Sequence, residues 1–262
     1  MRVGVFQCAG GGLTPDERLD RLAAAIGDQD FDLVVCPELF MSGYNVGDSL
    51  HELAEPCGGP FSSKIAELAQ RRGTAIVYGY PERDGGSVFN AAACIDRAGR
   101  VVANHRKLLL PPGFERDFFI AGGGLTMFGL GGVRCGLLVC YDAEFPESVR
   151  AAAEAGAMVV IVPTALSDNW PLVAHQLMPT RAFENGVWLL YANHAGSENG
   201  TTYLGASCIL APDGKDVARA GSGQELLAAD LDMARVTAMQ DRLPYVHDIK
   251  LLRRSLSQKT RS

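Results

Sequence analysis

The sequence predicts an α/β protein in which two β-sheets are flanked by helices. Short apolar runs rich in β-favouring residues alternate with amphipathic helical segments along the chain. Antiparallel strands joined by turns that contain Pro and Gly are expected in its last third. No linker, internal repeat or low-complexity segment interrupts the 262 residues. We therefore expect one domain over 1–262, with about 249–262 as a C-terminal tail or arm.

The first part of the chain is expected to contribute two helices and five strands. Thr14, Pro15 and Glu17 are the residue types of an N-cap, a first helical position and a capping box, which predicts a helix through about Ile26. A second helix is expected over about 58–72. The strands are expected at 2–8, 31–36, 74–79, 87–96 and 100–105, with a turn-rich segment at 81–86 between the third and the fourth.

The second part is expected to begin with a hairpin whose second strand ends at Cys140. The four residues that end in Val139 are apolar and β-favouring, polar residues begin at Cys140, and Pro146 favours the first turn of a helix. The basic end from Lys250 has little to bury, so it is either frayed or an arm that lies on another subunit. The remaining expected elements are strands at 126–130, 158–162, 187–192, 203–210, 215–219 and 225–231, and helices at 146–155, 171–184 and from 233.

The composition argues against several classes of protein. The net charge of −6 does not suit a nucleic-acid partner. No apolar run reaches the roughly 18 residues that a membrane span requires. The N-terminus has no signal-peptide pattern, so we expect a cytoplasmic location.

The cysteines and histidines suggest neither disulfides nor a metal site. The seven cysteines are scattered without Cys-x-x-Cys pairs, and the five histidines have no ligand spacing. We expect free thiols in a reducing compartment, and we expect no metal and no organic cofactor.

Three predicted strand ends carry residues that together suit amide hydrolysis. Glu38 follows the strand at 31–36, Lys107 follows the strand at 100–105, and Cys140 ends the strand that begins at Val133. Such a reaction needs a nucleophile, a base and a donor for the oxyanion, and a thiol, a carboxylate and an amine fill these roles. From the residues alone, a core cysteine, a solvated or helix-capping glutamate and a solubilising lysine remain open alternatives.

The same segments resemble the nitrilase superfamily of carbon–nitrogen hydrolases, and the similarity spans nearly the whole chain. The segments that carry it are Leu33–Glu38, Arg106-Lys107 with Glu115 eight residues on, Cys140–Asp142 with Phe145–Glu147, Val162–Thr164, Arg181–Asn185 and Pro212–Gly214. The resemblance implies an α-β-β-α sandwich that becomes four-layered when it pairs into a homodimer or a larger homo-oligomer.

The resemblance also implies the catalytic residues. Glu38, Lys107 and Cys140 would form the triad, and Glu115 would be a fourth, positioning carboxylate. Glu38 would take the proton of the Cys140 thiol, with the Lys107 cation stabilising the thiolate. Lys107 and the backbone N–H of Tyr141 would hold the tetrahedral anion, and a thioester on Cys140 would follow.

Within the superfamily, Cys140-Tyr141-Asp142 is similar to the amidase branches, whereas true nitrilases usually have Cys-Trp-Glu. Glu144 occupies a position where these branches often have Arg, which favours a neutral or cationic substrate, although a surface or subunit-contact ion pair is an alternative. The residues that we expect to contact the substrate are Tyr44, Glu144, Thr164, Trp170 and Asn193; Trp188 either lines the pocket or lies in the core.

The sequence therefore predicts an amidase that hydrolyses a small carboxamide to a carboxylic acid and ammonia. The substrate class expected from the resemblance is an ω-amino amide such as 5-aminopentanamide, or an amino-acid-derived amide. An N-carbamoyl amine hydrolase and a dicarboxylate ω-amidase are alternatives on the same scaffold. A non-catalytic α/β binding protein is the alternative from another class.

Overall fold

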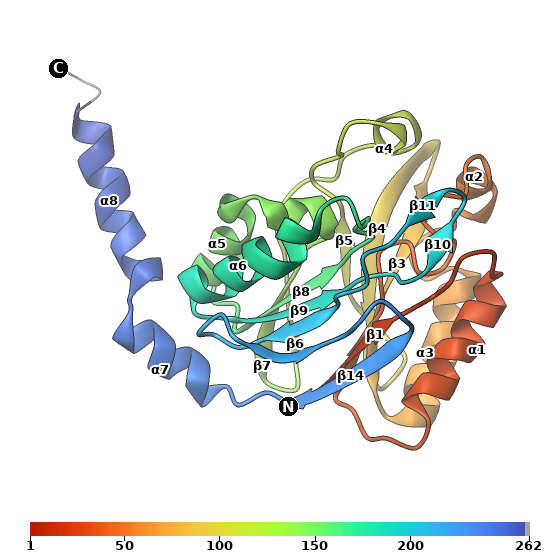
Figure 1. The fold of residues 1–262 in the computed structure, drawn as a ribbon, viewed down its shortest axis with the longest axis horizontal. Helices are drawn as coiled ribbons and strands as arrows, with labels where there is room; N and C mark the ends of the chain where they lie inside the picture. The colour runs from red at the N-terminus through yellow and green to blue at the C-terminus, as the bar shows by residue number, and fades with distance from the viewer. Residues whose placement is uncertain (260–262) are drawn as a thin grey trace.

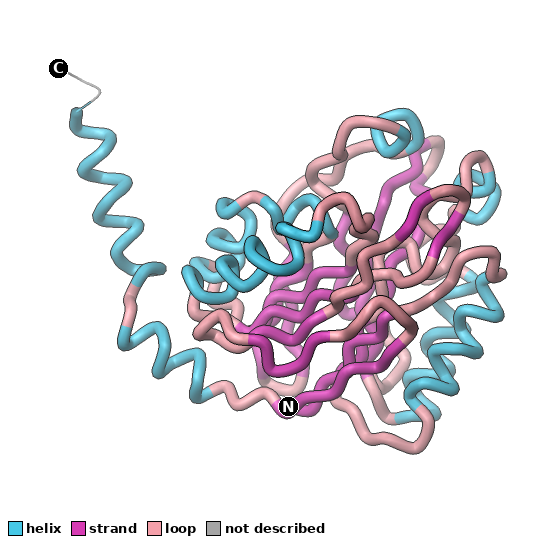
Figure 2. Tube along the Cα trace, viewed as in Figure 1, coloured by secondary structure: helices cyan, strands magenta, loops and turns pink. Residues whose placement is uncertain are grey.

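The computed structural model describes residues 1–259, in which two six-stranded mixed sheets pack face to face between two layers of helices (Figure 1). Helices α1 and α3 cover the outer face of one sheet, and α5 and α6 cover the outer face of the other (Figures 1 and 2). The predicted α-β-β-α sandwich is confirmed.

The first sheet has the strand order β14-β1-β2-β3-β4-β5. The three strands β1, β2 and β3 run parallel, and β14 and β4 join them in antiparallel pairs. Strand β5 pairs antiparallel with β4 and therefore runs in the direction of β2. The bounds are β1 Arg2–Gln7, β2 Leu33–Val35, β3 Ala75–Asp84, β4 Ser87–Ile95, β5 Val101–Arg106 and β14 Glu225–Asp230.

The second sheet has the order β13-β12-β9-β8-β7-β6, and its strands β7, β8 and β9 are parallel. A separate two-stranded ribbon, β10 with β11, lies beyond β9 in the chain. The bounds are β6 Thr126–Leu130, β7 Val133–Leu137, β8 Val159–Pro163, β9 Trp188–Ala192, β10 Ser197–Glu198, β11 Thr201–Thr202, β12 Cys208–Leu210 and β13 Asp216–Arg219.

Strands that are buried on both faces divide their side chains between two cores. In β2, Leu33 and Val35 enter the core between the sheets, whereas Val34 packs under α1 and α3. In β8, Ile161 enters the same central core and Val160 packs under α5 and α6. This alternation follows from the two-residue period of a strand. It explains why these strands are continuous apolar runs in the sequence.

The helices begin and end where the sequence supplies the appropriate residues. Thr14 and Glu17 form the predicted capping box at α1, which stabilises such a helix end by about 1 kcal/mol. Helix α3 ends at a left-handed Gly73. The bounds are α1 Pro15–Ile26, α2 Ser49–Leu53, α3 Pro60–Arg72, α4 Phe114–Phe118, α5 Pro146–Glu154, α6 Met178–Asn185, α7 Ala234–Arg242 and α8 Tyr245–Lys259.

Several predicted boundaries were wrong, and each has a local cause. Strand β3 continues through Pro81 to Asp84 in its pairing with β4. Pro81 is tolerated because the pairing of β3 with β2 ends at Val77, so the proline interrupts no ladder between these two strands. Strand β7 stops at Leu137, because the N–H of Val139 donates to the Asp142 carboxylate instead of a neighbouring strand.

Two further elements differ from the prediction. The expected strand at 203–210 is reduced to β12, because Gly205 and Ala206 have positive φ angles of 69° and 53° that break an extended chain. The expected helix at 171–184 contains a π-helical turn, Val173–Leu177, before α6 begins.

The C-terminal segment is helical rather than frayed. Helix α8 extends away from the two sheets (Figures 1 and 2). Its leucines Leu251, Leu252 and Leu256 are exposed. The part of the expected tail at 260–262 lies outside the described residues. None of the helices within 1–259 combines the length and apolar character needed to cross a bilayer.

Candidate active site

The chain segments that leave β2, β5 and β7 meet where the carboxyl ends of the two sheets face each other. Glu38 follows β2, Lys107 follows β5 directly, and Cys140 begins a 3₁₀ turn, Cys140–Glu144, after β7. The N–H of Glu38 donates to the carbonyl of Thr164, at the end of β8 in the other sheet, over 3.3 Å. Residues from both sheets therefore contribute to one site.

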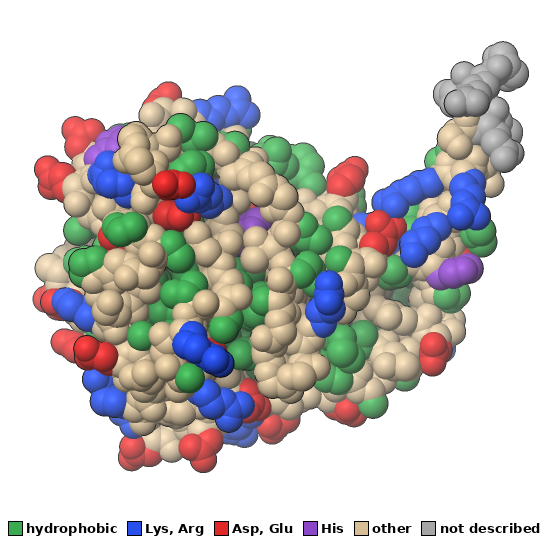
Figure 3. Space-filling view, turned by 180° about the vertical axis from the view of Figure 1, so that it is seen from behind, with side chains coloured by type: hydrophobic (Ala, Val, Ile, Leu, Met, Phe, Trp, Pro, Cys, Tyr) green, Lys and Arg blue, Asp and Glu red, His purple; other side chains and the backbone are tan. Residues whose placement is uncertain are grey.

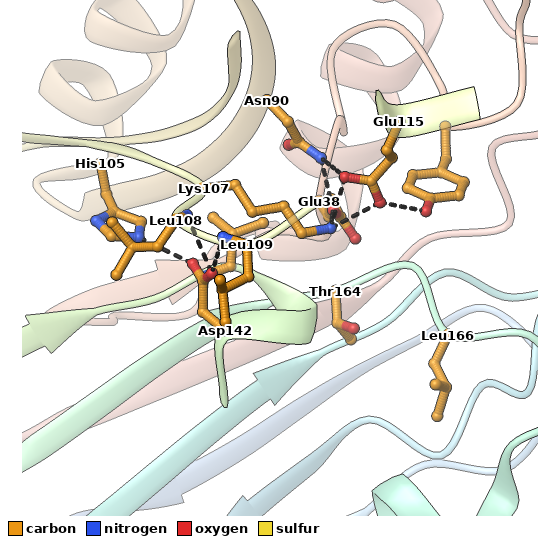
Figure 4. Close-up of polar contacts among 12 residues, drawn as sticks. Glu38, Asn90, His105, Lys107, Leu108, Leu109, Glu115, Asp142, Thr164 and Leu166 are labelled. Carbon is orange, nitrogen blue, oxygen red and sulfur yellow. Dashed lines mark hydrogen bonds and ion pairs between the residues drawn. The ribbon is translucent and has the colours of Figure 1, made fainter. Parts of the chain in front are cut away.

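Lys107 lies between two carboxylates, as Figure 4 shows. Its Nζ atom is 2.7 Å from Oε1 of Glu38 and 2.7 and 2.8 Å from the two oxygens of Glu115. All three side chains are at most 1% exposed. Burial alone would lower the pKa of Lys107, but the negative charges of its neighbours raise it above its ordinary value, so the ammonium is retained.

Glu38 has one satisfied and one free carboxylate oxygen. Oε1 accepts hydrogen bonds from Lys107 and, at 2.7 Å, from Nδ2 of Asn90 on β4. Oε2 is buried and has no hydrogen-bond partner among the described residues. Burial raises the pKa of Glu38 to about 6, against the opposing effect of Lys107. A buried oxygen with an unused lone pair, on a carboxyl that titrates near neutrality, is suited to accept a proton.

Cys140 occupies a strained backbone position at the start of its turn. Its φ angle is +46°, in the left-handed region that residues other than glycine rarely adopt. Burial and then the charge of Glu38 raise the pKa of the thiol well above its ordinary value, although Lys107 and the hydroxyl of Thr164 lower it. The effect of the Lys107 cation that the sequence led us to expect is thus present, and burial and the neighbouring carboxylates oppose it.

Asp142 connects the loop of Lys107 to the turn of Cys140. Its Oδ1 accepts hydrogen bonds from the backbone N–H groups of Leu108 and Leu109, at 3.0 and 2.9 Å. Its Oδ2 lies 3.1 Å from Nε2 of His105 and accepts from the N–H of Val139 at 3.2 Å. This fully buried carboxylate therefore fixes the position of one catalytic candidate relative to another (Figure 4).

Tyr44 reaches the same cluster from the loop after Glu38. Its hydroxyl donates to Oε1 of Glu115 over 2.5 Å. Oε2 of Glu198, on β10, accepts the backbone N–H of Tyr44 and the hydroxyl of Tyr203, each at 2.8 Å, and Oε1 of Glu198 pairs with Arg18. The β10–β11 ribbon thus holds the loop that presents Tyr44.

The other residues expected to contact the substrate differ in their burial and in their hydrogen-bond partners. Thr164 is buried, and its hydroxyl donates to Tyr191 over 3.2 Å close to the thiol. Glu144 closes the turn of Cys140 and is half-buried. The side chain of Asn193 is fully buried and bonded to the backbone of Leu166, Gly205 and His194, so its contact with a substrate stays a prediction.

The two tryptophans do not form a pocket wall together. Trp188 lies in the core between the sheets, and its indole N–H donates to the carbonyl of Asp232. Trp170 is 65% exposed and therefore lies at the surface, not in the core. The expected contact of Trp170 with a substrate stays a prediction.

Sequence reasoning missed Asn90, Asp142 and Glu198. Asn90 is a polar residue in the otherwise apolar run of β4, and that contrast is a signal that could have identified it. Asp142 and Glu198 carry no comparable signal, because most of their partners are distant in the chain. Within residues 1–259, no group of three or more His, Cys, Asp or Glu side chains is arranged to hold a metal ion.

Comparison with known proteins decides the family. The model of the carbon–nitrogen hydrolase family matches residues 2–241. The chain belongs to this family. The carbon–nitrogen hydrolase is 41% identical over 259 residues to the hydrolase in the pqqF 5′ region of Pseudomonas protegens, covering 95% of this chain and 91% of that protein. It is 32% identical to an (R)-stereoselective amidase from a Pseudomonas species, covering 96% and 92%.

Solved structures agree with the fold of this carbon–nitrogen hydrolase. The NitN amidase of Nesterenkonia sp. AN1 superposes with a TM-score of 0.84 at 35% identity, covering 94% of this chain and 98% of the other. One structure of that amidase contains acrylamide joined by Michael addition to the active-site cysteine, and another is a complex with butyramide. The resemblance to the nitrilase superfamily is confirmed.

Proposed function

We propose that this carbon–nitrogen hydrolase is an amidase that converts a small carboxamide into a carboxylic acid and ammonia through a thioester on Cys140. Glu38 is the general base, Lys107 and the backbone N–H of Tyr141 stabilise the oxyanion, and Glu115 positions Lys107. The observation that carries this assignment is the unpartnered Oε2 of Glu38, a buried proton acceptor in a cluster that includes Lys107 and the Cys140 thiol.

The mechanism assigns one step to each of these groups. The Glu38 carboxylate accepts the proton of the thiol as Cys140 Sγ attacks the carbonyl carbon, and the carbonyl electrons move onto oxygen. The negative oxygen is stabilised by the ammonium of Lys107, which its carboxylate neighbours keep charged. The proton held by Glu38 passes to the leaving nitrogen, and ammonia departs.

Hydrolysis of the thioester uses the same groups. Glu38, ionised again, takes a proton from water, and the resulting hydroxide attacks the thioester carbon. The second tetrahedral anion collapses, the carbon–sulfur bond breaks, and the proton returns from Glu38 to the sulfur. The carboxylic acid is released, and Cys140 is regenerated as a thiol.

The relatives support an amidase but do not agree on its substrate. They include the (R)-stereoselective amidase, a 2-oxoglutaramate amidase of Bacillus subtilis and an omega-amidase of Danio rerio. A dicarboxylate ω-amidase would prefer amides with an acidic end, and an N-carbamoyl amine hydrolase would release carbon dioxide together with ammonia. A non-catalytic binding protein would release neither.

The test is a screen of small amides for ammonia release, with carbon dioxide measured in parallel. We expect Cys140→Ala to abolish turnover while leaving the thermal unfolding midpoint nearly unchanged. Cys57→Ala, which removes the exposed thiol, is the matched control and should keep full activity. Iodoacetamide should label Cys140 ahead of the buried Cys36 and Cys135. Ordinary turnover by Cys140→Ala would refute the assignment.

The proposal extends to assembly as a homodimer through the face that carries α8. An apolar groove of about 470 Å³ lies among α5, α6 and α8, and Phe183, Ile249 and Leu252 line it. The exposed leucines of α8 leave apolar surface in water. The helix also carries Lys250, Arg253 and Arg254, and Figure 3 shows basic side chains along the projecting C-terminal arm, whereas the chain as a whole is acidic.

Light scattering tests this assembly. We expect the wild-type protein to have the mass of a dimer, and Leu252→Asp combined with Leu256→Asp to have that of a monomer. Val217→Asp, at an exposed apolar residue of β13, is the control and should keep the wild-type mass. A monomeric wild-type protein would contradict the proposal.

A further inference from the structure

A buried ion pair lies outside the group of residues that the proposed mechanism uses. Arg18 on α1 and Glu198 on β10 have side chains that are 1% and 3% exposed, and Nη2 of Arg18 lies 3.1 Å from Oε1 of Glu198. The two residues are 180 positions apart in the chain. Desolvation largely offsets the attraction within such a pair, and well-packed apolar side chains are often as stable. Net stability is therefore a weak reason for this pair, and its contacts indicate another role.

The other oxygen of Glu198 holds the loop that follows Glu38. Oε2 accepts the backbone N–H groups of Tyr44 and Asn45, each at 2.8 Å. It also accepts the hydroxyl of Tyr203 at 2.8 Å. Hydrogen bonds to an ionised carboxylate are roughly twice as strong as those between neutral groups. Two consecutive N–H groups on one carboxylate oxygen therefore fix both the position and the direction of this part of the loop.

The loop approaches the ion pair so closely that no side chain fits between them. Gly43 has a φ angle of +90°, in the left-handed region. A Cβ atom at this position would lie 2.3 Å from Oε1 of Glu198 and 2.7 Å from Nη2 of Arg18. The backbone conformation and the close approach both favour glycine. The segment from Gly43 to Asn45 therefore packs directly on the two charged groups.

This segment reaches the catalytic cluster through the hydroxyl of Tyr44. The hydroxyl donates to Oε1 of Glu115 over 2.5 Å, and the Tyr44 ring packs edge-on against Phe114, with 5.0 Å between the ring centroids. Both oxygens of Glu115 accept from Nζ of Lys107, which also donates to Glu38 (Figure 4). The β10–β11 ribbon lies at the same end of the molecule as α4, which carries Glu115 (Figure 1). A displacement of the segment would therefore move Glu115 and the ammonium that it holds.

A second set of contacts joins the surroundings of Glu198 to the general base. The ring of Tyr203, whose hydroxyl donates to Glu198, lies against the ring of His194, with 5.0 Å between the centroids. Nε2 of His194 donates to the backbone carbonyl of Glu38 over 2.7 Å. The groups around Glu198 therefore contact the backbone of the base as well as the loop that carries Tyr44.

We propose that Arg18 and Glu198 are positioning residues for amide hydrolysis: the ion pair holds the loop of Tyr44, so that Tyr44 places Glu115 and Lys107 for the reaction. The inference rests on the amidase function proposed above. Within residues 1–259, neither side chain of the pair has a hydrogen bond or ion pair to the catalytic candidates, so both act through the loop. Misplacement of a catalytic group by about 1 Å can cost about a hundredfold in rate. Loss of the pair therefore lowers kcat, because the groups that it places act in the transition state.

A double-mutant cycle between Glu198→Gln and Tyr44→Phe tests the inference, with kcat and KM measured on pentanamide, or on the fastest amide of the screen if pentanamide is not hydrolysed. We expect Glu198→Gln to lower kcat about tenfold or more and to change KM less than about threefold. Tyr44→Phe removes only the hydroxyl and should also lower kcat. Because both changes act on one contact, the double variant should lose no more than about twice the larger single loss, instead of the product of the two. Arg18→Lys, which keeps the charge, should keep a higher kcat than Arg18→Met.

The matched control is Glu55→Gln, at another buried carboxylate that accepts two consecutive backbone N–H groups. Glu55 accepts those of Phe61 and Ser62 at the start of α3, at 2.8 and 3.0 Å. We expect this variant to lower the thermal unfolding midpoint and to keep the wild-type kcat. Equal losses of kcat in Glu55→Gln and Glu198→Gln would show a general effect of destabilisation and would overturn the inference.

Losses that multiply in the double variant, or a wild-type kcat in Glu198→Gln, would overturn the inference and leave the amidase assignment intact. If Glu198→Gln does not fold, Arg18→Met combined with Glu198→Gln replaces it in the cycle, since that variant leaves neither charge of the pair buried alone. Absence of ammonia from every amide tested with the wild-type protein would overturn the amidase function, and the inference with it.

Discussion

Replacing Lys107 by methionine removes the one positive charge that two buried carboxylates share. At 2.7 Å and an effective dielectric constant of about 20, each contact corresponds to about 6 kcal/mol of attraction, which the desolvation of the ions largely offsets. Removing one partner of such a buried cluster leaves charge unpaired, and this costs about 3–5 kcal/mol of unfolding free energy. We expect Lys107→Met to lose that amount at pH 8.

The pH dependence of this loss identifies its origin. In the folded protein the pKa of Glu38 is already raised to about 6, and it rises further once Lys107 no longer opposes burial. A raised carboxyl pKa contributes stability that is present at low pH and is lost as the pH rises through the folded-state pKa. The destabilisation of Lys107→Met should therefore be smaller at pH 5 than at pH 8.

Urea unfolding followed by circular dichroism at both pH values measures the effect. Lys64→Met is the control, because Lys64 pairs with Asp16 on the surface and such pairs contribute about 0–1 kcal/mol. We expect no difference between pH 5 and pH 8 for the control. A loss below about 1 kcal/mol for Lys107→Met at pH 8, or an equal loss at both pH values, would refute the reasoning.

Three other predictions concern the base, the connecting carboxylate and a close approach. First, kcat/KM for an uncharged amide should rise with pH through about 6, because only ionised Glu38 accepts a proton; a flat profile from pH 5 to pH 8 contradicts this. Second, Asp142→Ala should lower the unfolding free energy by about 3 kcal/mol and reduce kcat, since it leaves backbone N–H groups of two loops unpaired; urea titration and single-turnover rates check both effects. Third, Gly79→Ala should destabilise the protein by about 1–3 kcal/mol, because the new Cβ would lie 2.3 Å from the backbone nitrogen of Leu39. Gly129→Ala, where no atom lies within 4 Å of the new Cβ, should change the thermal midpoint little, and equal shifts in the two glycine variants would disprove the steric argument.

The candidate site was predictable to the extent that it depends on strand ends. Glu38 and Lys107 each follow an apolar run, and the carboxyl ends of strands that run in one direction meet at one edge of a sheet. The pattern thus indicated which residues are near the same edge. It did not indicate which oxygen of Glu38 is free, because that depends on Asn90, a residue 52 positions away on another strand.

The electrostatic surroundings of Cys140 were not predictable for a related reason. A neighbouring Lys107 suggested a stabilised thiolate, but the balance depends on how deeply the sulfur is buried and on two carboxylates from distant segments. The fold was easier to predict than the site. Strands such as β8 place their side chains alternately into two cores and are therefore continuous apolar runs in the sequence. Predicted strand boundaries were wrong where a side chain accepted a backbone hydrogen bond in place of a neighbouring strand. The carboxylate of Asp142, which accepts the N–H of Val139, is one case.

The hydrogen bond from the N–H of Glu38 to the carbonyl of Thr164 joins the two sheets. The carboxylate of Glu38 and the ammonium of Lys107 come from one sheet, and the sulfur of Cys140 comes from the other. A displacement of one sheet relative to the other would separate the reacting groups before any strand lost its pairing. The rate of turnover should therefore respond more strongly to the relative position of the two sheets than any spectroscopic signal from the backbone does. Substitutions that add or remove a methyl group in the core between the sheets, far from any reacting atom, can therefore change the rate of turnover by shifting one sheet relative to the other.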